Sequence, residues 1–256
     1  MSRIVSIHSF RGGTGKSNLT ANLTATIAQH GKRVGVIDTD IQSPGIHVLF
    51  GMDEETMDKS LNDYLWGKCA IEETAYDVTS VLRTSPDEVA PGGGIYLIPS
   101  SIRAGEIARI LREGYDVGML NDGFRDLVDR LNLDYLMIDT HPGLNEETLL
   151  SIAISDALII ILRPDQQDFQ GTAVTVDVAR RLEVPKMMLV VNKVLSSFDP
   201  EGVRQEVEKS FNAKVGGVLP LTEDLIRLGS REVFCLRFPD HTWTQRVQEI
   251  AAQIMA

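Results

Sequence analysis

Residues 9–17, Ser-Phe-Arg-Gly-Gly-Thr-Gly-Lys-Ser, have the composition and spacing of a loop that binds phosphate groups. The glycines let backbone N–H groups turn toward an anion, and the ammonium group of Lys16 can reach terminal phosphates. The hydroxyl group of Ser17 is a suitable ligand for Mg²⁺. An apolar run over residues 4–7 precedes the loop, and a helical pattern follows it. The loop is therefore expected to lead from a strand into a helix N-terminus, which attracts anions.

Carboxylates stand at the ends of two apolar segments. Residues 33–38 end in Asp38 and are followed closely by Asp40, and residues 135–139 end in Asp139. Open α/β sheets bind ligands at the C-terminal ends of their strands, so we expect these carboxylates to lie beside the loop. An aspartate after a buried strand is the Walker B arrangement, which predicts that Asp139 holds Mg²⁺. Taken without the loop, Asp38 and Asp40 would be interpreted as a solvated polar strand end.

Apolar runs alternate with segments of helical periodicity along the whole chain. This alternation predicts the α/β class, with a doubly wound, mostly parallel sheet and helices on both faces, in a single domain over residues 1–256. No role is assigned to residues 41–94. The expected strands are 4–7, 33–38, 95–99, 135–139, 157–162, 186–191 and 214–219, and the expected helical stretches are 19–27, 60–66, 104–112, 123–131, 167–182, 223–228 and 241–255.

Residues 11–17, Arg-Gly-Gly-Thr-Gly-Lys-Ser, resemble the deviant Walker A loop of the ParA/MinD family of ATPases, which usually reads Lys-Gly-Gly-x-Gly-Lys-Ser/Thr. The resemblance extends over nearly the whole chain through its other motifs. The first lysine of the family contacts nucleotide phosphates across a dimer that encloses ATP. Arg11 takes its position here, and arginine keeps the charge but differs in length and shape.

The resemblance implies a Mg²⁺-dependent ATPase that binds ATP and forms a homodimer in the ATP state. Asp40 corresponds to the aspartate that positions the attacking water, and Asp38 to an aspartate near the Mg²⁺ shell. We therefore expect Asp40, Lys16 and Arg11 to act in catalysis. The expected metal-binding residues are Ser17, Asp38 and Asp139.

The family's base-recognising asparagine corresponds to Asn192, and the segment that lines the base corresponds to Pro220-Leu221. An asparagine side chain both donates and accepts, which suits the edge of a purine. A turn asparagine without a ligand is the alternative. The expected nucleotide contacts are Arg11, Gly12, Gly13, Thr14, Gly15, Lys16, Ser17, Asn18, Asn192 and Pro220.

Residues 140–143, Thr-His-Pro-Gly, resemble the family's switch II segment. We interpret His141 as a loop residue, with a catalytic base as the minor alternative. Gly143 is expected to supply a backbone N–H group near the terminal phosphate.

The implied function is slow ATP hydrolysis that times the positioning of a cellular cargo such as DNA, a division site or a protein assembly. An adaptor protein is expected to stimulate hydrolysis. A nucleotide-binding regulator with little hydrolysis stays open as the alternative, because the change at Arg11 puts the contact across the dimer in question. The net charge of −11 disfavours nonspecific nucleic-acid binding. Four arginines in the last part of the chain are interpreted as a solvated surface rather than a DNA patch: Arg227, Arg231, Arg237 and Arg246.

The remaining features separate related classes. Cys69 and Cys235 are far apart and are expected to be reduced thiols of a cytoplasmic protein. Neither follows the segment that resembles the family's switch I, Asp38-Thr39-Asp40, or the one that resembles switch II, which argues against a reductase of the nitrogenase iron protein type. Bacterial tyrosine kinases end in a cluster of tyrosines, and the tail of this chain has none, which argues against that class. The stretch 241–255 is expected to pack on the core and does not resemble a membrane-targeting tail.

Overall fold

An eight-stranded sheet forms the centre of the molecule. The computed structural model describes residues 2–82 and 91–256. The strand order is β3-β4-β2-β5-β1-β6-β7-β8, and every neighbouring pair is parallel except β3 with β4. The strands are β1 Arg3–His8, β2 Arg33–Asp38, β3 Tyr76–Asp77, β4 Gly94–Ile98, β5 Tyr135–Asp139, β6 Ala157–Leu162, β7 Lys186–Val194 and β8 Val215–Pro220.

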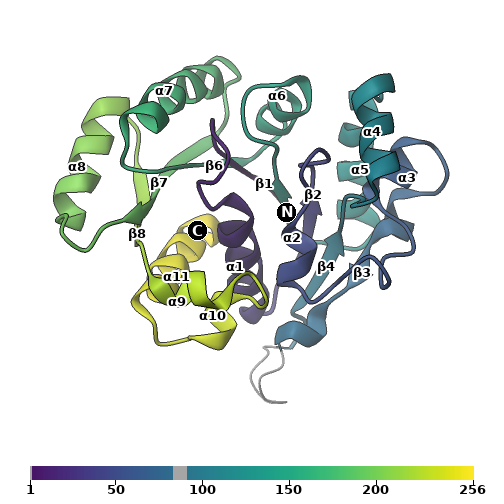
Figure 1. Ribbon diagram of the computed structural model, residues 1–256, viewed down its shortest axis with the longest axis horizontal. Coiled ribbons are helices and arrows are strands. Elements are labelled where there is room, and N and C mark those ends of the chain that lie inside the picture. Colours follow the sequence, from purple (N-terminus) through teal and green to yellow (C-terminus); the bar gives the residue numbers. More distant parts are fainter. Residues whose placement is uncertain (1, 83–90) are drawn as a thin grey trace.

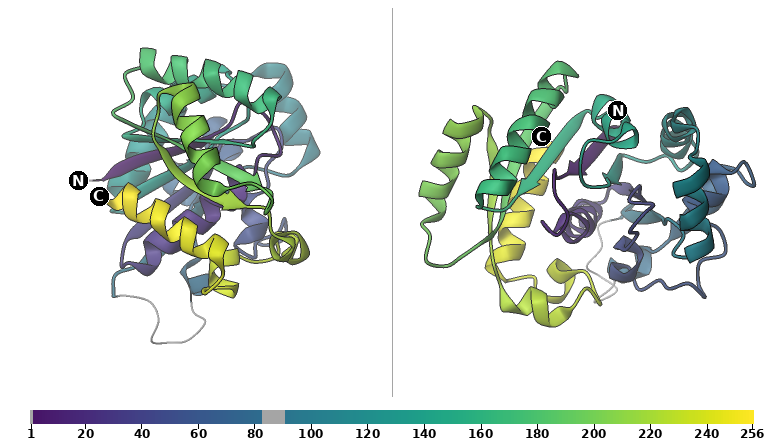
Figure 2. Two further views of the ribbon diagram at one scale, coloured as in Figure 1. Left: turned by 90° about the vertical axis from the view of Figure 1, so that its left-hand side faces the viewer. Right: turned by 45° about the horizontal axis from the view of Figure 1, so that its top comes forward.

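Helices cover both faces of this sheet (Figures 1 and 2), which confirms the predicted doubly wound fold. Short 3₁₀ turns at Ile71–Thr74 and Thr79–Leu82 precede β4. The helices are α1 Lys16–Gln29, α2 Ile46–Leu49, α3 Leu61–Leu65, α4 Ala104–Glu113, α5 Val117–Arg130, α6 Glu146–Ala153, α7 Gln166–Arg181, α8 Pro200–Phe211, α9 Glu223–Leu228, α10 Phe234–Arg237 and α11 Thr242–Met255.

The central strands bury side chains on both faces, as their continuous apolar sequences predict. In β5, Met137 joins the cluster under α1, α10 and α11, while Leu136 and Ile138 join the cluster under α3 and α5. A third cluster lies under α6, α7 and α8 and includes Leu158 and Ile160 of β6. Adjacent residues on one strand therefore anchor helices of opposite layers, which fixes the register of the sheet.

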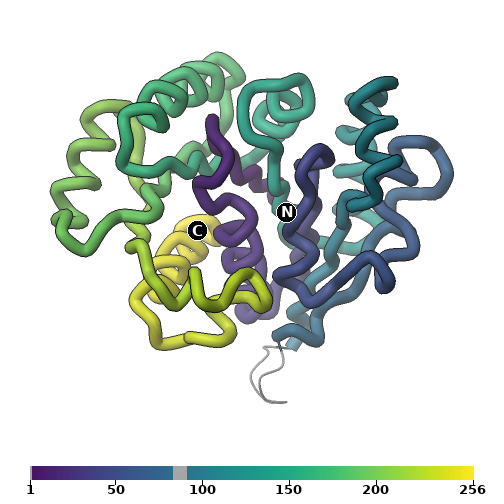
Figure 3. Tube along the Cα trace, viewed as in Figure 1, coloured from purple at the N-terminus to yellow at the C-terminus, as the bar shows by residue number. Residues whose placement is uncertain are grey.

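The last helix packs on the core, as expected. Trp243, Val247, Ile250 and Ile254 of α11 are buried beside α1. Figure 3 shows the two helices side by side, α1 in purple and α11 in yellow. No helix within residues 2–82 and 91–256 is long and apolar enough to cross a bilayer.

Some elements differ from the sequence prediction. Helix α5 begins at Val117, where Asp116 caps it by accepting a hydrogen bond from Gly118 N, and not near residue 123. Helices α6 and α8 were not predicted. Helix α6 has only 8 residues, and α8 follows a loop, begins at Pro200 and has Val207 and Phe211 as its buried residues. Within the stretch without an assigned role, residues 83–90 lie outside the described residues.

The register of three parallel strands brings their polar ends together. Asp38 at the end of β2 pairs with Asp139 at the end of β5, and Ile7 of β1 pairs with Asp139 on the other side. The loop that follows β1 therefore begins directly beside both aspartates. This edge of the sheet is where the sequence predicts a phosphate and metal site.

Candidate phosphate and metal site

The loop between β1 and α1 depends on glycines at two positions. Gly13 has φ +77° and Gly15 has φ +100°, in the left-handed region that other residues rarely adopt. A Cβ atom at Gly15 would also lie 2.5 Å from the side-chain nitrogen of Asn192, whereas one at Gly13 would meet no atom within 4 Å. Gly15 is thus required both by its backbone conformation and by its close approach to β7.

Two residues at the end of β7 support the loop from outside. Asn192 Nδ2 donates to the carbonyl oxygen of Thr14 over 2.8 Å, and Lys193 Nζ donates to the carbonyl oxygen of Gly13 over 2.7 Å. These bonds turn carbonyl oxygens outward and leave the opposite side of the loop to its N–H groups. Asn192 is 3% exposed. Val194, at the end of the same strand, pairs with Pro220 of β8. The adenine contacts predicted for Asn192 and Pro220 stay predictions.

The start of α1 joins the loop to β5. Lys16 is 7% exposed, although lysine is seldom buried without a charged partner. Thr20, one turn further on, donates both to the carbonyl oxygen of Lys16 and to Asp139 Oδ1, over 3.0 and 3.1 Å. Ser17 also bonds Asp139 and, with Lys16, opposes the rise of its pKa. The helix N-terminus, Lys16 and the carboxylate are therefore held as one unit.

The two strand-end aspartates are buried. Burial raises the pKa of Asp139 to about 6. Burial and the nearby Asp139 charge raise the pKa of Asp38 well above its ordinary value, although the N–H groups of Asp40 and Gly45 donate to its oxygens over 3.0 Å each. Two buried carboxylates beside one lysine leave uncompensated negative charge when both are ionised.

These residues fit a magnesium ion. Mg²⁺ prefers oxygen ligands, keeps several waters and commonly takes one or two carboxylates with substrate phosphates. The hydroxyl of Ser17 and the carboxylates of Asp38 and Asp139 provide oxygens at the base of the loop, and a cation there would offset the buried charge. No cluster of three or more His, Cys, Asp or Glu side chains suited to a metal occurs in the described residues.

Asp40 follows Asp38 in the loop after β2 and lies next to His141. Its Oδ1 atom is 3.7 Å from His141 Nε2 and accepts from the backbone N–H of Ser43 over 3.2 Å. Burial raises the pKa of Asp40, and the charges of His141 and Lys16 oppose the rise. The two predicted switch segments thus meet through one acid and one imidazole. The N–H group of Gly143, expected near a terminal phosphate, here donates to the carbonyl oxygen of Ser9 over 3.1 Å.

The predicted loop and Asp40 open onto one shared cavity. Its volume is about 280 Å³, and His141 and Pro142 also line it. Thr14 does not line it, and its hydroxyl group is buried without a hydrogen-bond partner in the described structure. The residues lining the cavity are Gly12, Gly13, Gly15, Lys16, Ser17, Asn18, Asp40, Ser43, His141 and Pro142.

Arg11 is turned away from this cavity and toward α7. Its Nη1 atom donates to Gln167 Oε1 and lies 3.8 Å from Asp168 Oδ1. The Asp168 carboxylate is 2% exposed and accepts from the Arg163 guanidinium over 3.0 and 3.1 Å. Arg11 itself is 41% exposed. The loop is therefore attached to α7 through a residue that the sequence predicts to contact phosphates.

Several site residues were not found by the sequence analysis. Thr20 and Lys193 each lie within four residues of a predicted contact, and the i+4 spacing of Thr20 from Lys16 was a usable signal. His8 ends β1 beneath the site, where its Nδ1 lies 2.9 Å from Thr140 Oγ1. Burial lowers the pKa of His8 to about 3, so it stays neutral. The contacts of Gln167 with Arg11 join segments 156 residues apart, and no local pattern shows them.

The fold and site define a P-loop protein of the doubly wound α/β class. The chain belongs to the family described as the AAA domain (AAA_31), whose model matches residues 2–187. An uncharacterized ATP-binding protein of Methanocaldococcus jannaschii is 27% identical over 256 residues, covering 100% of this chain and 88% of that protein. An iron-sulfur cluster carrier protein of Methanococcus maripaludis is 28% identical, covering 85% and 72%. The flagellum site-determining protein YlxH of Helicobacter pylori is 24% identical, covering 99% and 82%.

Comparison with solved structures gives the same fold. The septum site-determining protein MinD of Pyrococcus horikoshii, a complex with Mg-ADP, superposes with a TM-score of 0.79 at 20% identity, covering 99% of this chain and 96% of that one. The expected ParA/MinD fold is thereby confirmed.

Three of the four arginines in the last part of the chain make local contacts. Arg227 pairs with Glu223 over 3.0 Å and Arg246 with Glu249 over 2.9 Å, and Arg231 donates to the carbonyl oxygens of 227 and 228. These three arginines are engaged within their own helices or turns. The solvated surface predicted for them and for Arg237 stays a prediction. Both cysteines are free thiols, and burial raises the pKa of Cys235 to about 12.

Proposed function

We propose that this protein is a Mg²⁺-dependent ATPase whose ATP-bound form is a homodimer, and that the dimer positions or partitions a cellular cargo. The observation that supports the proposal most directly is the cavity that Lys16, Ser17 and the loop glycines share with Asp40. The loop amides and Lys16 would hold the phosphates, and Asn192 and Pro220 would contact the base. A site-determining protein among the sequence relatives supports the positioning output.

The reaction is ATP plus water giving ADP and phosphate. A water oxygen forms a bond to the terminal phosphorus atom while the bond from that atom to the ADP oxygen breaks. Asp40 would accept a hydrogen bond from the attacking water and hold it in line, and Lys16 would face the charge that develops on the phosphate oxygens. Magnesium held by Ser17, Asp38 and Asp139 would supply charge neutralisation of the phosphates. His141, 3.7 Å from Asp40, would orient that carboxylate.

Asp40→Ala is the direct test of this mechanism. The substitution should lower ATP turnover by about 100-fold or more, the usual contribution of a positioned acid–base group, while the dissociation constant for ADP changes little. Asp116→Ala, which removes the helix cap of α5 outside the site, serves as a control for general damage. Equal loss of turnover and of ADP affinity in Asp40→Ala would contradict the assigned role.

A nucleotide-binding regulator with little hydrolysis is the second candidate. The observation that favours it is the orientation of Arg11, which contacts Gln167 and Asp168 rather than the cavity. If the arginine keeps this contact when ATP is bound, the dimer contact of the family is lost. An iron-sulfur carrier has less support, because Cys235 in α10 is 4% exposed and its thiol is covered by Asn22 and Thr26 of α1.

A further inference from the structure

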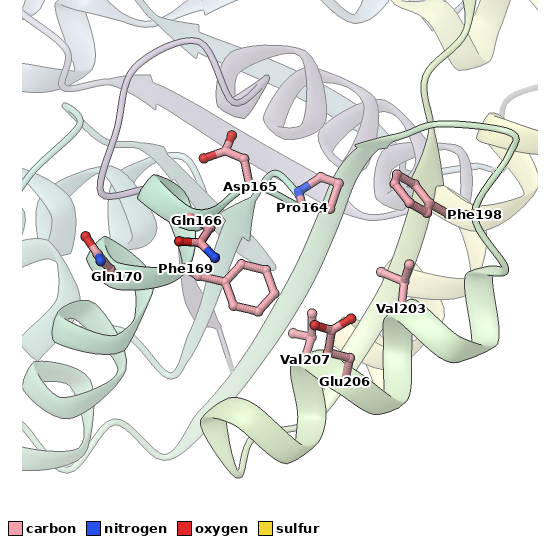
Figure 4. A pocket seen from close by; sticks show the side chains of 9 residues that line it. All are labelled: Pro164, Asp165, Gln166, Phe169, Gln170, Phe198, Val203, Glu206 and Val207. Atoms are coloured by element: carbon pink, nitrogen blue, oxygen red, sulfur yellow. The ribbon is translucent and has the colours of Figure 1, made fainter.

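A second cavity lies between the first turns of α7 and the adjoining side of α8, outside the phosphate site (Figure 4). Its volume is about 330 Å³, within the range of roughly 300–1,000 Å³ in which proteins bind ligands or side chains of a partner. It shares none of its lining residues with the phosphate cavity. The residues lining it are Pro164, Asp165, Gln166, Phe169, Gln170, Phe198, Val203, Glu206 and Val207.

The floor of this cavity is apolar. Phe169 points from α7 toward α8 (Figure 4), and its ring lies 5.3 Å from that of Phe211 at the end of α8. Val207 of α8 is buried. Phe198, in contrast, is 47% exposed at the mouth of the cavity, and Leu195 nearby in the same loop is 49% exposed. Exposed large apolar side chains beside a preformed cavity are typical of sites that receive an apolar anchor from a partner.

The rim carries negative charge. Asp165 and Glu206 are the charged residues that line the cavity, and no lysine, arginine or histidine does so. Asp165 lies 3.3 Å from Arg163, whereas Glu206 makes no ion pair in residues 2–82 and 91–256. The whole chain has a net charge of −11, so a second copy of it would bring further negative charge. Charge complementarity therefore favours a basic partner over self-association.

The same turns of α7 contact the phosphate loop on their other side. Gln167 and Asp168 contact Arg11. Gly171 lets the Phe10 ring approach so closely that a Cβ atom there would lie 2.1 Å from Phe10 Cδ1. A ligand in the cavity would thus press on a helix turn that holds the beginning of the loop.

We infer that the cavity between α7 and α8 is the docking site for a basic partner segment, which inserts one bulky apolar side chain beside Phe169 and Phe198 and sets lysine or arginine against Glu206 and Asp165. The inference adds a partner site to the proposed ATPase and rests on that function only for the effect on turnover. Binding itself requires no nucleotide, so the two can fail separately.

The test uses random short peptides displayed on phage, selected on the full chain without nucleotide and counter-selected on the Phe198→Asp variant. Enriched peptides are synthesised with a fluorophore, and their affinity is measured by anisotropy. Val174→Asp is the matched control for Phe198→Asp, because Val174 is 48% exposed on α7 outside the cavity. Asp177→Lys, also on α7, is the matched control for Glu206→Lys, because it makes the same change of charge.

Selected peptides should combine an aromatic or large aliphatic residue with lysine or arginine. Phe198→Asp and Glu206→Lys should each weaken binding by at least about tenfold, while the two controls change it by less than about twofold. Raising the salt concentration from about 50 to about 500 mM should weaken binding as well. Peptides that bind in this way without altering ATP turnover support the docking site and count against the proposed coupling to hydrolysis.

Three outcomes would overturn the inference. The first is that no peptide survives counter-selection. The second is that the selected peptides lack basic residues or lose as much affinity with the controls as with the cavity variants. The third is nucleotide-independent self-association that disappears in Phe198→Asp, which would make a second copy of the chain the occupant. Thermal unfolding of each variant shows whether a loss of binding comes from a loss of fold.

Discussion

The guanidinium group of Arg11 lies 3.8 Å from the buried carboxylate of Asp168. The pair joins the phosphate loop to α7, and Asp168 is held in place by Arg163. Arg11 is 41% exposed, and ion pairs of this kind contribute at most about 1 kcal/mol. The contact is therefore weak enough to be exchanged for a nucleotide phosphate, which accepts charge-assisted hydrogen bonds from arginine.

Removing the exposed partner of Arg11 should favour the dimer. In Gln167→Ala, the guanidinium loses one hydrogen bond in the monomer, and the ATP concentration for half-maximal dimer formation should fall by about twofold to fivefold. Gln166→Ala, which changes the neighbouring side chain, should leave that concentration unchanged. Light scattering over an ATP titration gives the comparison. An unchanged or higher midpoint in Gln167→Ala would show that the contact does not restrain Arg11.

Two loop glycines allow a matched comparison. Both Gly13→Ala and Gly15→Ala place a side chain at positive φ, at a cost of about 1 kcal/mol each. Only Gly15→Ala also forces its Cβ against Asn192. It should weaken ADP binding by at least about tenfold more than Gly13→Ala, since the loop must move away from β7. Adding Asn192→Ala to Gly15→Ala should recover part of the lost stability. Equal effects of the two alanines would contradict the close packing at Gly15.

The buried carboxylate of Asp139 should destabilise the protein without metal. Its pKa is raised to about 6, so the ionised form carries a cost that is present above that pH and disappears toward pH 4. Asp139→Asn should therefore raise the free energy of unfolding at pH 8 by up to about 3 kcal/mol in the presence of a chelator. Mg²⁺ with ADP should stabilise the wild type more than Asp139→Asn. Asp177→Asn, an exposed control, should show neither effect. A less stable Asp139→Asn variant at pH 8 would rule out this interpretation.

His8 should produce a pH dependence of the opposite sign. Its pKa is lowered to about 3 in the folded protein, mainly by burial, whereas the unfolded chain takes up a proton near pH 6.5. Stability is then full above pH 6.5 and falls as the pH drops below it, by about 1.4 kcal/mol per pH unit. Urea unfolding of the wild type and of His8→Asn between pH 5 and 7.5 gives the comparison. Below pH 6.5, the free energy of unfolding of His8→Asn should fall less steeply with decreasing pH than that of the wild type, by about 1.4 kcal/mol per pH unit. The same slope of unfolding free energy against pH in wild type and variant would contradict the lowered pKa of His8.

The sequence analysis found most of the fold because the central strands are continuous apolar runs and the loop carries its own local pattern. The meeting of Asp38 and Asp139 at the C-terminal ends of β2 and β5 was predictable because both follow such apolar runs. Helix α8 escaped prediction, since few of its positions are buried and its apolar pattern is weak. The contacts of Arg11 with α7 escaped because they depend on the order of β1 and β6 in the sheet, which residue types near Arg11 do not encode.

The roles of individual residues were predictable only as types. A lysine after a glycine-rich loop and an aspartate after a buried strand each have few structural alternatives. Asn192 shows the limit of such reasoning: its residue type indicates a donor near the loop, but its hydrogen bond to the carbonyl oxygen of Thr14 was not predicted. Its contact with adenine stays a prediction. Whether a side chain faces a ligand or the backbone next to it depends on tertiary packing.

The central claim is an ATP-driven dimer that depends on Arg11. The most direct measurement is the molecular mass in solution with ADP and with ATP, for Asp40→Ala and for Asp40→Ala combined with Arg11→Ala, with the first substitution slowing hydrolysis. The account predicts a monomer of 28.3 kDa with ADP, twice that mass with ATP in Asp40→Ala, and a monomer in both nucleotides when Arg11 is also changed. Dimers that form regardless of nucleotide and of Arg11, or a monomer with ATP in Asp40→Ala, would contradict it.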